Sequence, residues 1–288
     1  MRRPNYWRKT ESLHAKWCQN NVEADTKEEF LCVCCCFRKR KQMEWRRAMG
    51  QWILITGASG GIGQAIAKQL AKEGYSLYLH FHQNQRAIEG LLLELKQYGG
   101  EYFPIQADLK QPDAYKKIVE NIFTLDGIVH ASGISTYGLF TDMKDEEMKD
   151  LWNVHVHSFM CMARELLPKM LSKQNGNIIA ITSIWGQVGA AMEVAYSTVK
   201  GAQISFVKAL SKELAYNGIR VNAVAPGAIE TNMLHAFSPE ELQLIEDEIP
   251  MGRLGRPKEV AESVAFLLSE KSSYMTGQVL SLNGGWHM

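Results

Sequence analysis

The amino-acid sequence predicts an α/β protein built on a doubly wound parallel sheet of about seven strands. Three observations support this fold class. Short apolar segments alternate with longer segments of helical periodicity, the alternation runs from residue 52 to the C-terminus, and glycine or proline follows many of the apolar segments. Unbroken apolar strands are typical of parallel sheets, because helices cover both faces. We therefore expect a single domain over residues 49–288.

The first expected strand is Trp52–Thr56, a largely apolar segment that ends at Gly57. Apolar residues at helical spacing follow between Ile62 and Leu70, and Gly74 marks the end of that helix. Each later strand is a short apolar segment of the same kind. These strands are expected at residues 77–81, 102–107, 127–130, 177–183, 220–225 and 278–282.

The longest expected helix spans residues 144–173, and Pro168 predicts a kink near its end. Proline opens three of the other helices, where a missing N–H group is tolerated, and glycine closes two of them. These other helices are expected at residues 88–98, 112–123, 196–216, 239–246 and 257–269.

The first 50 residues differ in composition from the rest of the chain. They hold 12 Lys and Arg against 6 Asp and Glu, and five of the six cysteines. The cysteines between Cys32 and Cys36 could form a metal or lipidation site, but structural zinc sites usually use separated pairs. Because the segment lacks sustained periodicity and either Met43 or Met49 could be the first residue, we expect residues 1–48 to be a disordered or non-native extension.

Charge and hydropathy exclude several classes of partner. The 288 residues carry a formal net charge of +1, so no strong field attracts nucleic acid or an anionic membrane. The longest apolar segment near the N-terminus, Leu31–Phe37, is far shorter than the ~20 residues that a bilayer requires. Beyond residue 36, Cys161 is the single cysteine, which suits a cytoplasmic protein without disulfides.

A glycine-rich turn, T-G-A-S-G-G-I-G over residues 56–63, joins the first strand to the first helix. Glycine lets the backbone approach a phosphate closely, and a helix N-terminus offers free N–H groups and a partial positive charge. The strand–turn–helix context favours a dinucleotide site over a purely structural turn. The pyrophosphate contacts are expected at Gly57, Ser59, Gly61, Ile62 and Gly63.

The spacing T-G-x-x-x-G-x-G resembles the short-chain dehydrogenase/reductase superfamily, whose fold is of the Rossmann type. Four further motifs agree over residues 52–288: Asp108-Leu109 after the third strand, Ser183 after the fifth, Tyr196-x-x-x-Lys200, and Pro226-Gly227 after the sixth. The resemblance implies cofactor contacts at Asp108, Leu109, Ser132, Gly133, Tyr196, Lys200, Pro226, Gly227, Ile229 and Thr231.

One motif departs from this superfamily. Its members usually have Asn-Asn-Ala-Gly after the fourth strand, where this chain has His130-Ala131-Ser132-Gly133. Gly133 has no side chain, so a cofactor can still approach the backbone closely at this position. The hydrogen bonds that the two amides would make must therefore come from other groups.

Tyr196 and Lys200 are four residues apart on an expected helix, so their side chains share one face. Ketone reduction needs a proton donor, and a nearby ammonium group lowers the pKa of a phenol. The resemblance implies that Tyr196 is the general acid/base, that Lys200 tunes it and holds the nicotinamide ribose, and that Ser183 binds the carbonyl oxygen. It also implies a proton relay through Asn153, although an Asn in a helix can be purely structural.

Two His-x-His pairs, His80/His82 and His155/His157, raise the question of a metal. The first pair shares one face of a strand and could chelate. No third ligand is evident and the expected chemistry uses a nicotinamide, so we expect no metal.

The residue that ends the second strand usually selects the nicotinamide cofactor. An acid there binds the 2′-hydroxyl of NAD, but this chain has His80-Phe81-His82-Gln83. His82 and Arg86 remain as partners for a 2′-phosphate. The sequence therefore predicts NADP(H).

Two classes of carbonyl reductase fit the motifs. The segments 143–147 and 283–285 resemble 3-oxoacyl-[acyl-carrier-protein] reductases, but Asp142 and Asn217 stand where basic residues are common in them. The closer overall resemblance is to the elongation factor P 5-aminopentanone reductases, which implies a ketone on a lysine of elongation factor P. Glu193 would attract the amine of that substrate, and Trp185 lies in the same loop region. A solvated Glu193 is the alternative.

The resemblance further implies a homotetramer that pairs through the helices at residues 144–173 and 196–216. Modified elongation factor P or a small ketone is the expected partner. A nucleotide-sensing regulator on the same fold is an alternative, which the full Tyr-Lys-Ser-Asn set disfavours.

Overall fold

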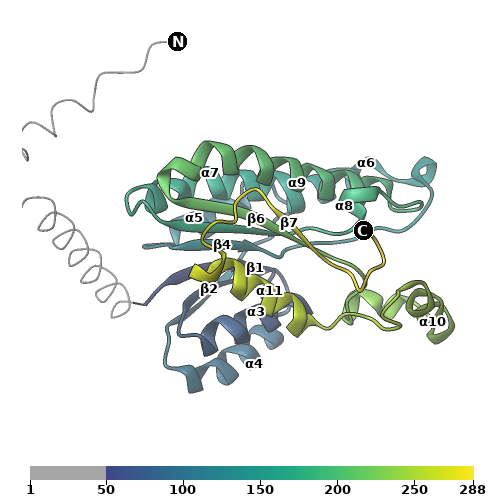
Figure 1. The fold of residues 1–288 in the computed structure, drawn as a ribbon, viewed down its shortest axis with the longest axis horizontal. Coiled ribbons are helices and arrows are strands. Elements are labelled where there is room, and N and C mark those ends of the chain that lie inside the picture. The colour runs from purple at the N-terminus through teal and green to yellow at the C-terminus, as the bar shows by residue number, and fades with distance from the viewer. Residues whose placement is uncertain (1–49) are drawn as a thin grey trace, which may run out of the picture. The chain divides into compact units, whose positions relative to one another are not determined.

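The computed structural model describes residues 50–288, apart from the side chains of residues 235 and 236; the expectations for residues 1–48 lie outside the described residues. Seven parallel strands form one sheet in the order β3-β2-β1-β4-β5-β6-β7, which confirms the predicted fold class. The chain starts in the middle of the sheet, runs outward to β3, and then crosses to β4 and continues to β7 (Figure 1).

Most of the strands are buried on both faces, as their apolar sequences predict. Their edges agree with the expected ranges to within two residues. The strands are β1 (Trp52–Thr56), β2 (Ser76–Phe81), β3 (Tyr102–Gln106), β4 (Gly127–His130), β5 (Gly176–Ile181), β6 (Ile219–Pro226) and β7 (Val279–Leu282).

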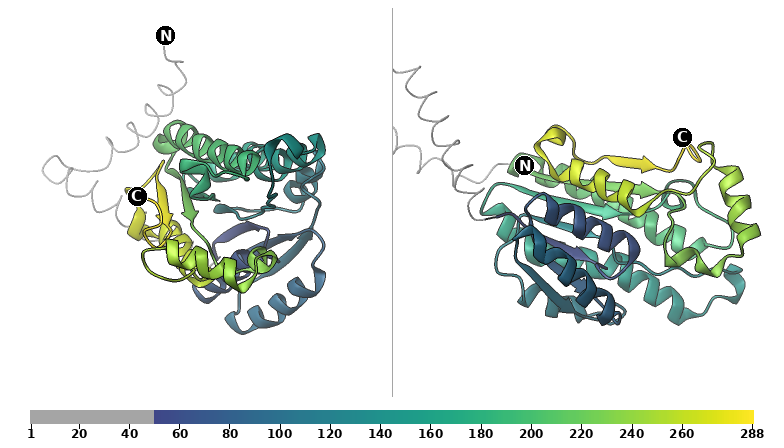
Figure 2. Two further views of the ribbon diagram at one scale, coloured as in Figure 1. Left: turned by 90° about the vertical axis from the view of Figure 1, so that its right-hand side faces the viewer. Right: turned by 90° about the horizontal axis from the view of Figure 1, so that it is seen from below.

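Helices cover the two faces of the sheet, and each layer encloses its own apolar core (Figures 1 and 2). On one face the helices are α3 (Gly61–Lys72), α4 (Gln85–Leu95) and α11 (Pro257–Leu268). On the other face they are α5 (Ala114–Glu120), α7 (Ser158–Leu171) and α9 (Val194–Leu214). Within residues 50–288, no helix has both the length and the apolar character needed to span a membrane.

The long helix expected at residues 144–173 is present in three parts. The helix α6 (Asp145–Trp152) leads into the π-helical segment Asn153–His157, and α7 follows directly. Pro168 lies inside α7, so the departure from α-helical hydrogen bonding occurs earlier than the proline predicted.

Three short helices lie beyond the carboxyl ends of the strands, at the edge where a doubly wound sheet binds its ligand. They are α8 (Trp185–Val188), the 3₁₀ helix Asn232–Ala236 and α10 (Pro239–Glu248). Because β1 and β4 are neighbours whose following connections diverge, the glycine-rich turn after β1 lies beside the His130–Gly133 segment after β4.

Candidate active site

The glycine-rich turn leaves a cradle that side chains would fill. Gly57 has a φ of +70°, and a Cβ on it would lie 2.8 Å from the carbonyl oxygen of Ala131. A Cβ on Gly63 would collide with the carbonyl oxygen of Gly57. No side chain caps the N-terminus of α3, so its first N–H groups stay free for an anion. These features fit a dinucleotide pyrophosphate.

Gly61 lies against a second predicted cofactor residue, Thr231. A Cβ on Gly61 would lie 2.9 Å from the Cγ2 methyl of Thr231, although the φ of Gly61 is not positive. The turn after β1 and the segment after β6 therefore meet, as expected if both contact the cofactor. The left-handed backbone of this turn occurs at Gly57 instead.

Gly61→Val is expected to weaken NADPH binding by about tenfold or more, because the branched side chain would push Thr231 aside and obstruct the N-terminus of α3. Fluorescence titration with NADPH measures the effect. Gly90→Val, in α4 with no atom near its added Cβ, is the matched control for a valine in a helix. Unchanged affinity in Gly61→Val would place the pyrophosphate elsewhere.

Two buried histidines, His130 at the end of β4 and His80 on β2, make hydrogen bonds around the segment where the superfamily has two amides. The Nδ1 atom of His130 lies 3.0 Å from the hydroxyl of Thr56, and that hydroxyl also accepts the N–H of Ser132 at 3.1 Å. His80 accepts the N–H of Gly57 and lies 3.1 Å from the carbonyl of Ala107. The β1, β2 and β4 ends are thus braced by imidazole rings, and burial lowers the pKa of His80 to about 4 and that of His130 to about 3.

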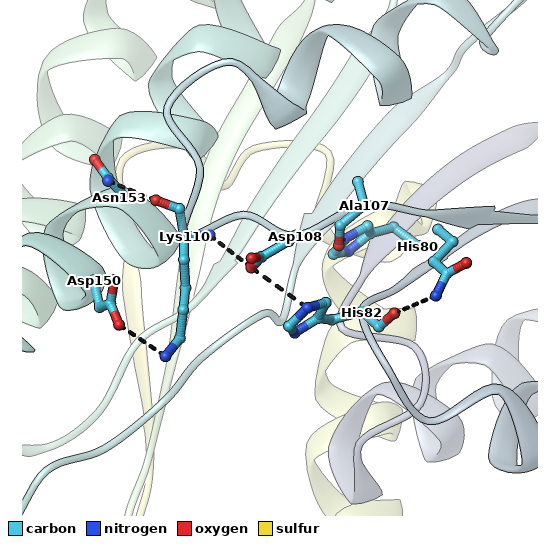
Figure 3. Close-up of polar contacts among 8 residues, drawn as sticks. His80, His82, Ala107, Asp108, Lys110, Asp150 and Asn153 are labelled. Atoms are coloured by element: carbon cyan, nitrogen blue, oxygen red, sulfur yellow. Dashed lines mark hydrogen bonds and ion pairs between the residues drawn. The ribbon is translucent and has the colours of Figure 1, made fainter.

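His82 and Asp108 face each other across the ends of β2 and β3, with 3.6 Å between Nε2 and Oδ1 (Figure 3). Asp108 also accepts the N–H of Lys110, and the Lys110 ammonium pairs with Asp150 of α6 at 2.7 Å. Figure 3 shows that His82 is directed toward Asp108, away from His80. Neither Asp108 nor Asp150 lies at the end of β2. The position after β2, where an acid would repel a 2′-phosphate, is occupied by His82.

His82→Asp is expected to lower kcat/KM for NADPH by about tenfold or more and to raise the relative use of NADH. The new carboxylate would repel the 2′-phosphate and lies beside Asp108. Steady-state kinetics with both cofactors measures the ratio, and His82→Gln controls for the loss of the ring without an added charge. A ratio that does not change would remove His82 from cofactor selection.

Tyr196, Ser183 and Lys200 are brought together as predicted. Tyr196 and Lys200 lie one turn apart near the start of α9, and the Lys200 ammonium nitrogen is 5.5 Å from the centre of the Tyr196 ring. Ser183 follows β5 and Thr182, and its hydroxyl acts on the phenol in the direction that lowers the Tyr196 pKa. Lys200 is buried, and its Nζ donates to the carbonyl of Ile181 at 2.8 Å.

Burial reverses the expected direction of the tyrosine pKa. The Tyr196 pKa is raised above its usual value, first by burial and then by the charge of Glu193. The Lys200 pKa is instead lowered to about 7 by burial. Lys200 is therefore only about half protonated at pH 7, and Tyr196, whose pKa is raised by burial, stays protonated and available as an acid.

Asn153, for which a relay role is predicted, has its hydrogen-bonding partner outside the Tyr196 and Lys200 pair. The Asn153 amide donates to the carbonyl of Lys110 at 2.7 Å (Figure 3). The side chain of the π-helical segment that contacts Tyr196 is His155, whose ring lies edge-on to the phenol with 5.6 Å between centres. His155 is fully buried and Asn153 is not. A signal was present in the sequence, because His155 is four residues from both Leu151 and Phe159 on the apolar face.

The predicted substrate residues, Trp185 and Glu193, lie at the start of α8 and just before α9. Glu193 immediately precedes α9, and the Trp185 side chain acts on its carboxylate in the direction that lowers the Glu193 pKa. Trp185 packs edge-on against Trp286, with 5.1 Å between ring centres. The Trp286 indole donates to Glu248 at the end of α10. Sequence reasoning did not select Trp286, which only the fold brings to this place.

An acidic pocket adjoins this site. It opens at the N-terminal end of α9 and is lined by Tyr137, Phe140, Asp142, Glu147, Met192 and Glu193 among others. None of its lining residues in the described part of the chain is Lys or Arg. Burial raises the pKa of Glu193, and a bound cation would lower it again.

The remaining predicted cofactor residues occupy the expected edge of the sheet. Gly227 donates its N–H to Leu282, and a Cβ on it would touch Asn283. Leu109 and Ile229 are buried, and Pro226 ends β6. Among the described residues, no group of three His, Cys, Asp or Glu side chains could hold a metal ion.

The fold and this arrangement define a nicotinamide-dependent oxidoreductase, and the chain belongs to the short-chain dehydrogenase/reductase superfamily. Residues 57–287 match the family model described as enoyl-(acyl carrier protein) reductase.

Named relatives fall in the same superfamily. An uncharacterized oxidoreductase, YmfI of Bacillus subtilis (strain 168), is 52% identical over 241 residues, which are 83% of this chain and 100% of that protein. The 3-oxoacyl-[acyl-carrier-protein] reductase FabG of Staphylococcus epidermidis (strain RP62A) is 36% identical over 244 residues, with 83% and 100% coverage. The crystal structure of YwfH, an NADPH dependent reductase involved in bacilysin biosynthesis, superposes with a TM-score of 0.78 at 27% identity, covering 83% of this chain and 98% of that one.

Proposed function

We propose that this protein is an NADPH-dependent carbonyl reductase whose substrate is the 5-aminopentanone ketone on a lysine of elongation factor P, reduced to 5-aminopentanol. The observation that carries the proposal is the acidic and aromatic surface beside the phenol of Tyr196. A ketone on an arm that ends in an ammonium group matches this surface in charge.

The geometry around Glu193 supports a cationic substrate. Its charge raises the pKa of Tyr196, so the carboxylate lies within electrostatic reach of the proton donor. The faces of Trp185 and Trp286 are nearby, and aromatic faces attract ammonium groups. A ketone held at Tyr196 and Ser183 would therefore place a nearby amine between a carboxylate and two indoles.

NADPH is the cofactor that the residues fit. The glycine-rich turn Gly57–Gly63 leaves room that fits a pyrophosphate, and His82 follows β2 at the position where NAD enzymes have an acid. The structurally similar YwfH is itself an NADPH dependent reductase. The bound nicotinamide supplies the hydride. Tyr196 supplies the proton, and Ser183 hydrogen-bonds the carbonyl oxygen as negative charge develops.

A 3-oxoacyl-[acyl-carrier-protein] reductase is the second candidate, because FabG proteins share 36% identity with this chain. An acidic carrier protein requires basic residues near the entrance. Asp142 and Glu147 line the pocket here instead, which disfavours that partner.

The deciding experiment is mass spectrometry of elongation factor P from cells with and without this protein. Loss of the two-hydrogen increment on the lysine adduct supports the proposal. The purified protein should also restore the increment with NADPH. An unchanged adduct, together with NADPH-dependent reduction of a 3-oxoacyl carrier protein, would establish the second candidate.

Glu193→Gln is expected to raise KM for an amine-bearing ketone by about fivefold, and less at high salt, because an exposed ion pair contributes ~1 kcal/mol. KM for a neutral ketone of the same size should not change. Steady-state kinetics with both ketones measures this difference, and Glu262→Gln on α11 is the control. Equal effects on both ketones would show that Glu193 does not recognise charge.

We further propose a homotetramer in the cytoplasm. An apolar groove between α7 and α9 supports the pairing of subunits, and the exposed Trp152 and Met160 line it. Cys161, also in this groove, is free. Sedimentation analysis that gave a monomer at all concentrations would contradict the assembly.

A further inference from the structure

Residues 283–288 form a closed turn directly after β7, which we call the 283–288 turn. The side-chain oxygen of Asn283 accepts the N–H of Gly285 at 3.0 Å, and its amide donates to the carbonyl of His287 at 2.7 Å. The backbone N–H of Trp286 donates to the Asn283 carbonyl at 3.1 Å. The backbone that carries the Trp286 side chain is therefore fixed by its own hydrogen bonds.

The 283–288 turn packs against the chain that follows α10 and against a predicted cofactor residue. The N–H of Met251 donates to the carbonyl of Gly284 at 3.1 Å, and a Cβ on Gly284 would lie 2.7 Å from Ile249. A Cβ on Gly227 would lie 3.5 Å from Cε3 of the Trp286 ring, an ordinary van der Waals distance. The Trp286 ring therefore lies beside the segment after β6, where we expect the cofactor.

The two indoles of the site lie among carboxylates. Nε1 of Trp286 donates to Glu248, the last residue of α10, at 3.3 Å. Trp185 acts on the carboxylate of Glu193 in the direction that lowers its pKa, as a hydrogen-bond donor does. Within residues 50–288, neither Glu193 nor Glu248 forms an ion pair. Two indoles beside two carboxylates without a cationic partner make a surface that attracts an ammonium group.

These contacts connect the proton donor to the 283–288 turn. The charge of Glu193 acts on the phenol of Tyr196, and Trp185 acts on Glu193. The ring of Trp185 meets that of Trp286 edge-on, with 5.1 Å between their centres. Trp286 is therefore separated from Tyr196 by two intervening side chains. This arrangement suits an arm of several carbons between a ketone and its ammonium group.

We propose that Trp286 is a specificity-determining residue of this reductase, whose indole forms the wall of the substrate site that selects ketones with an ammonium group at the end of the arm. The inference rests on the proposed function and names the residue that distinguishes a cationic arm from a neutral one. An indole attracts a cation through its π electrons, so this recognition needs no further charged side chain. The hydrogen bond to Glu248 and the contact with Gly227 hold the ring in place.

The kinetic test uses two ketones of the same shape. One is 5-(dimethylamino)pentan-2-one, a cation at pH 7 whose tertiary amine cannot condense with its own ketone, and the other is the neutral 6-methylheptan-2-one. With NADPH, Trp286→Leu should raise KM for the cationic ketone by about fivefold and that of the neutral ketone by less than about twofold. Trp286→Phe, which keeps an aromatic face, should recover most of the loss. Tyr274→Leu, at a fully exposed aromatic residue, is the control.

Two results would overturn the proposal. Equal rises in KM for both ketones would give Trp286 a packing role alone, and an unchanged KM for the cationic ketone would remove it from the site. If Trp286→Leu failed to fold, the decision would pass to Trp286→Phe and to a measurement on the wild-type protein.

This second measurement needs no turnover and is made with NADP⁺ bound. The indole N–H signal of Trp286 in the NMR spectrum, assigned by its loss in Trp286→Phe, should shift saturably with N,N-dimethylbutylamine, a cation at pH 7 that has the arm but no ketone. Potassium chloride at the same ionic strength should not move it. An unmoved signal would refute ammonium recognition by Trp286 even in an active reductase. If the elongation factor P adduct were unchanged in cells without this protein, the proposed function would fail, and this titration would still decide whether Trp286 binds an ammonium group.

Discussion

Tyr196→Phe is expected to lower kcat by at least about a hundredfold, with NADPH affinity almost unchanged. The phenol is the proton donor to the forming alkoxide, and Ser183 hydrogen-bonds it without being able to replace it at neutral pH. The substitution removes a single oxygen atom, so the packing against His155 is retained. Steady-state kinetics and NADPH fluorescence titration measure the two quantities.

Tyr216→Phe is the matched control, because Tyr216 is fully exposed beyond the end of α9. Turnover of Tyr196→Phe near the wild-type value would remove Tyr196 from the chemistry. Such a result, with a cellular function that survived the substitution, would favour a nucleotide-sensing role for this fold.

Lys200→Met is expected to abolish most of the turnover and yet to stabilise the folded protein at pH 7. Burial lowers the Lys200 pKa from 10.5 to about 7, a shift equivalent to roughly 4–5 kcal/mol of unfavourable burial. Removing the hydrogen bond to Ile181 costs about 1–3 kcal/mol in return. The net gain should raise Tm by about 5 °C for a domain of this size.

The pH dependence of stability shows whether the buried charge of Lys200 causes this difference. Between pH 7 and 10.5 the unfolded chain binds more protons at Lys200 than the folded one, so this residue makes wild-type stability rise with pH in that window. Lys200→Met lacks this contribution. The difference between its unfolding free energy and that of the wild type, measured with denaturant, should therefore shrink from pH 7 to pH 10. Lys208→Met, on an exposed position of α9, is the control. A destabilised Lys200→Met at pH 7 would mean that the buried ammonium is well solvated.

Local sequence patterns predicted the fold because the strands of a parallel sheet are buried on both faces and therefore have short apolar sequences. All seven strands and the helices α3, α9 and α11 lie close to the expected ranges. The cradle at Gly57–Gly63 was equally accessible to sequence reasoning, since glycine is required wherever a Cβ would collide with backbone.

Properties that depend on burial could not be predicted in the same way. The i,i+4 spacing of Tyr196 and Lys200 places them on one face, but it does not reveal that both are desolvated, which reverses the expected direction of the phenol pKa. Likewise, Asn153 matched the residue type expected for a relay. The π-helical segment decides which side chain faces Tyr196, and it turns His155 inward.

The π-helical segment also changes how α6 and α7 are related. Successive residues of an α-helix are rotated by about 100° around its axis. One extra residue in a turn therefore rotates the helix before that turn by about 100° relative to the helix after it. Here α7 packs in the core of the domain, whereas α6 carries Glu147 into the acidic pocket and Asp150 to Lys110. A deletion of a single residue at 153–157 would therefore reorient the Glu147 side of the acidic pocket and the Asp150–Lys110 pair together, while the sheet and its core kept their register.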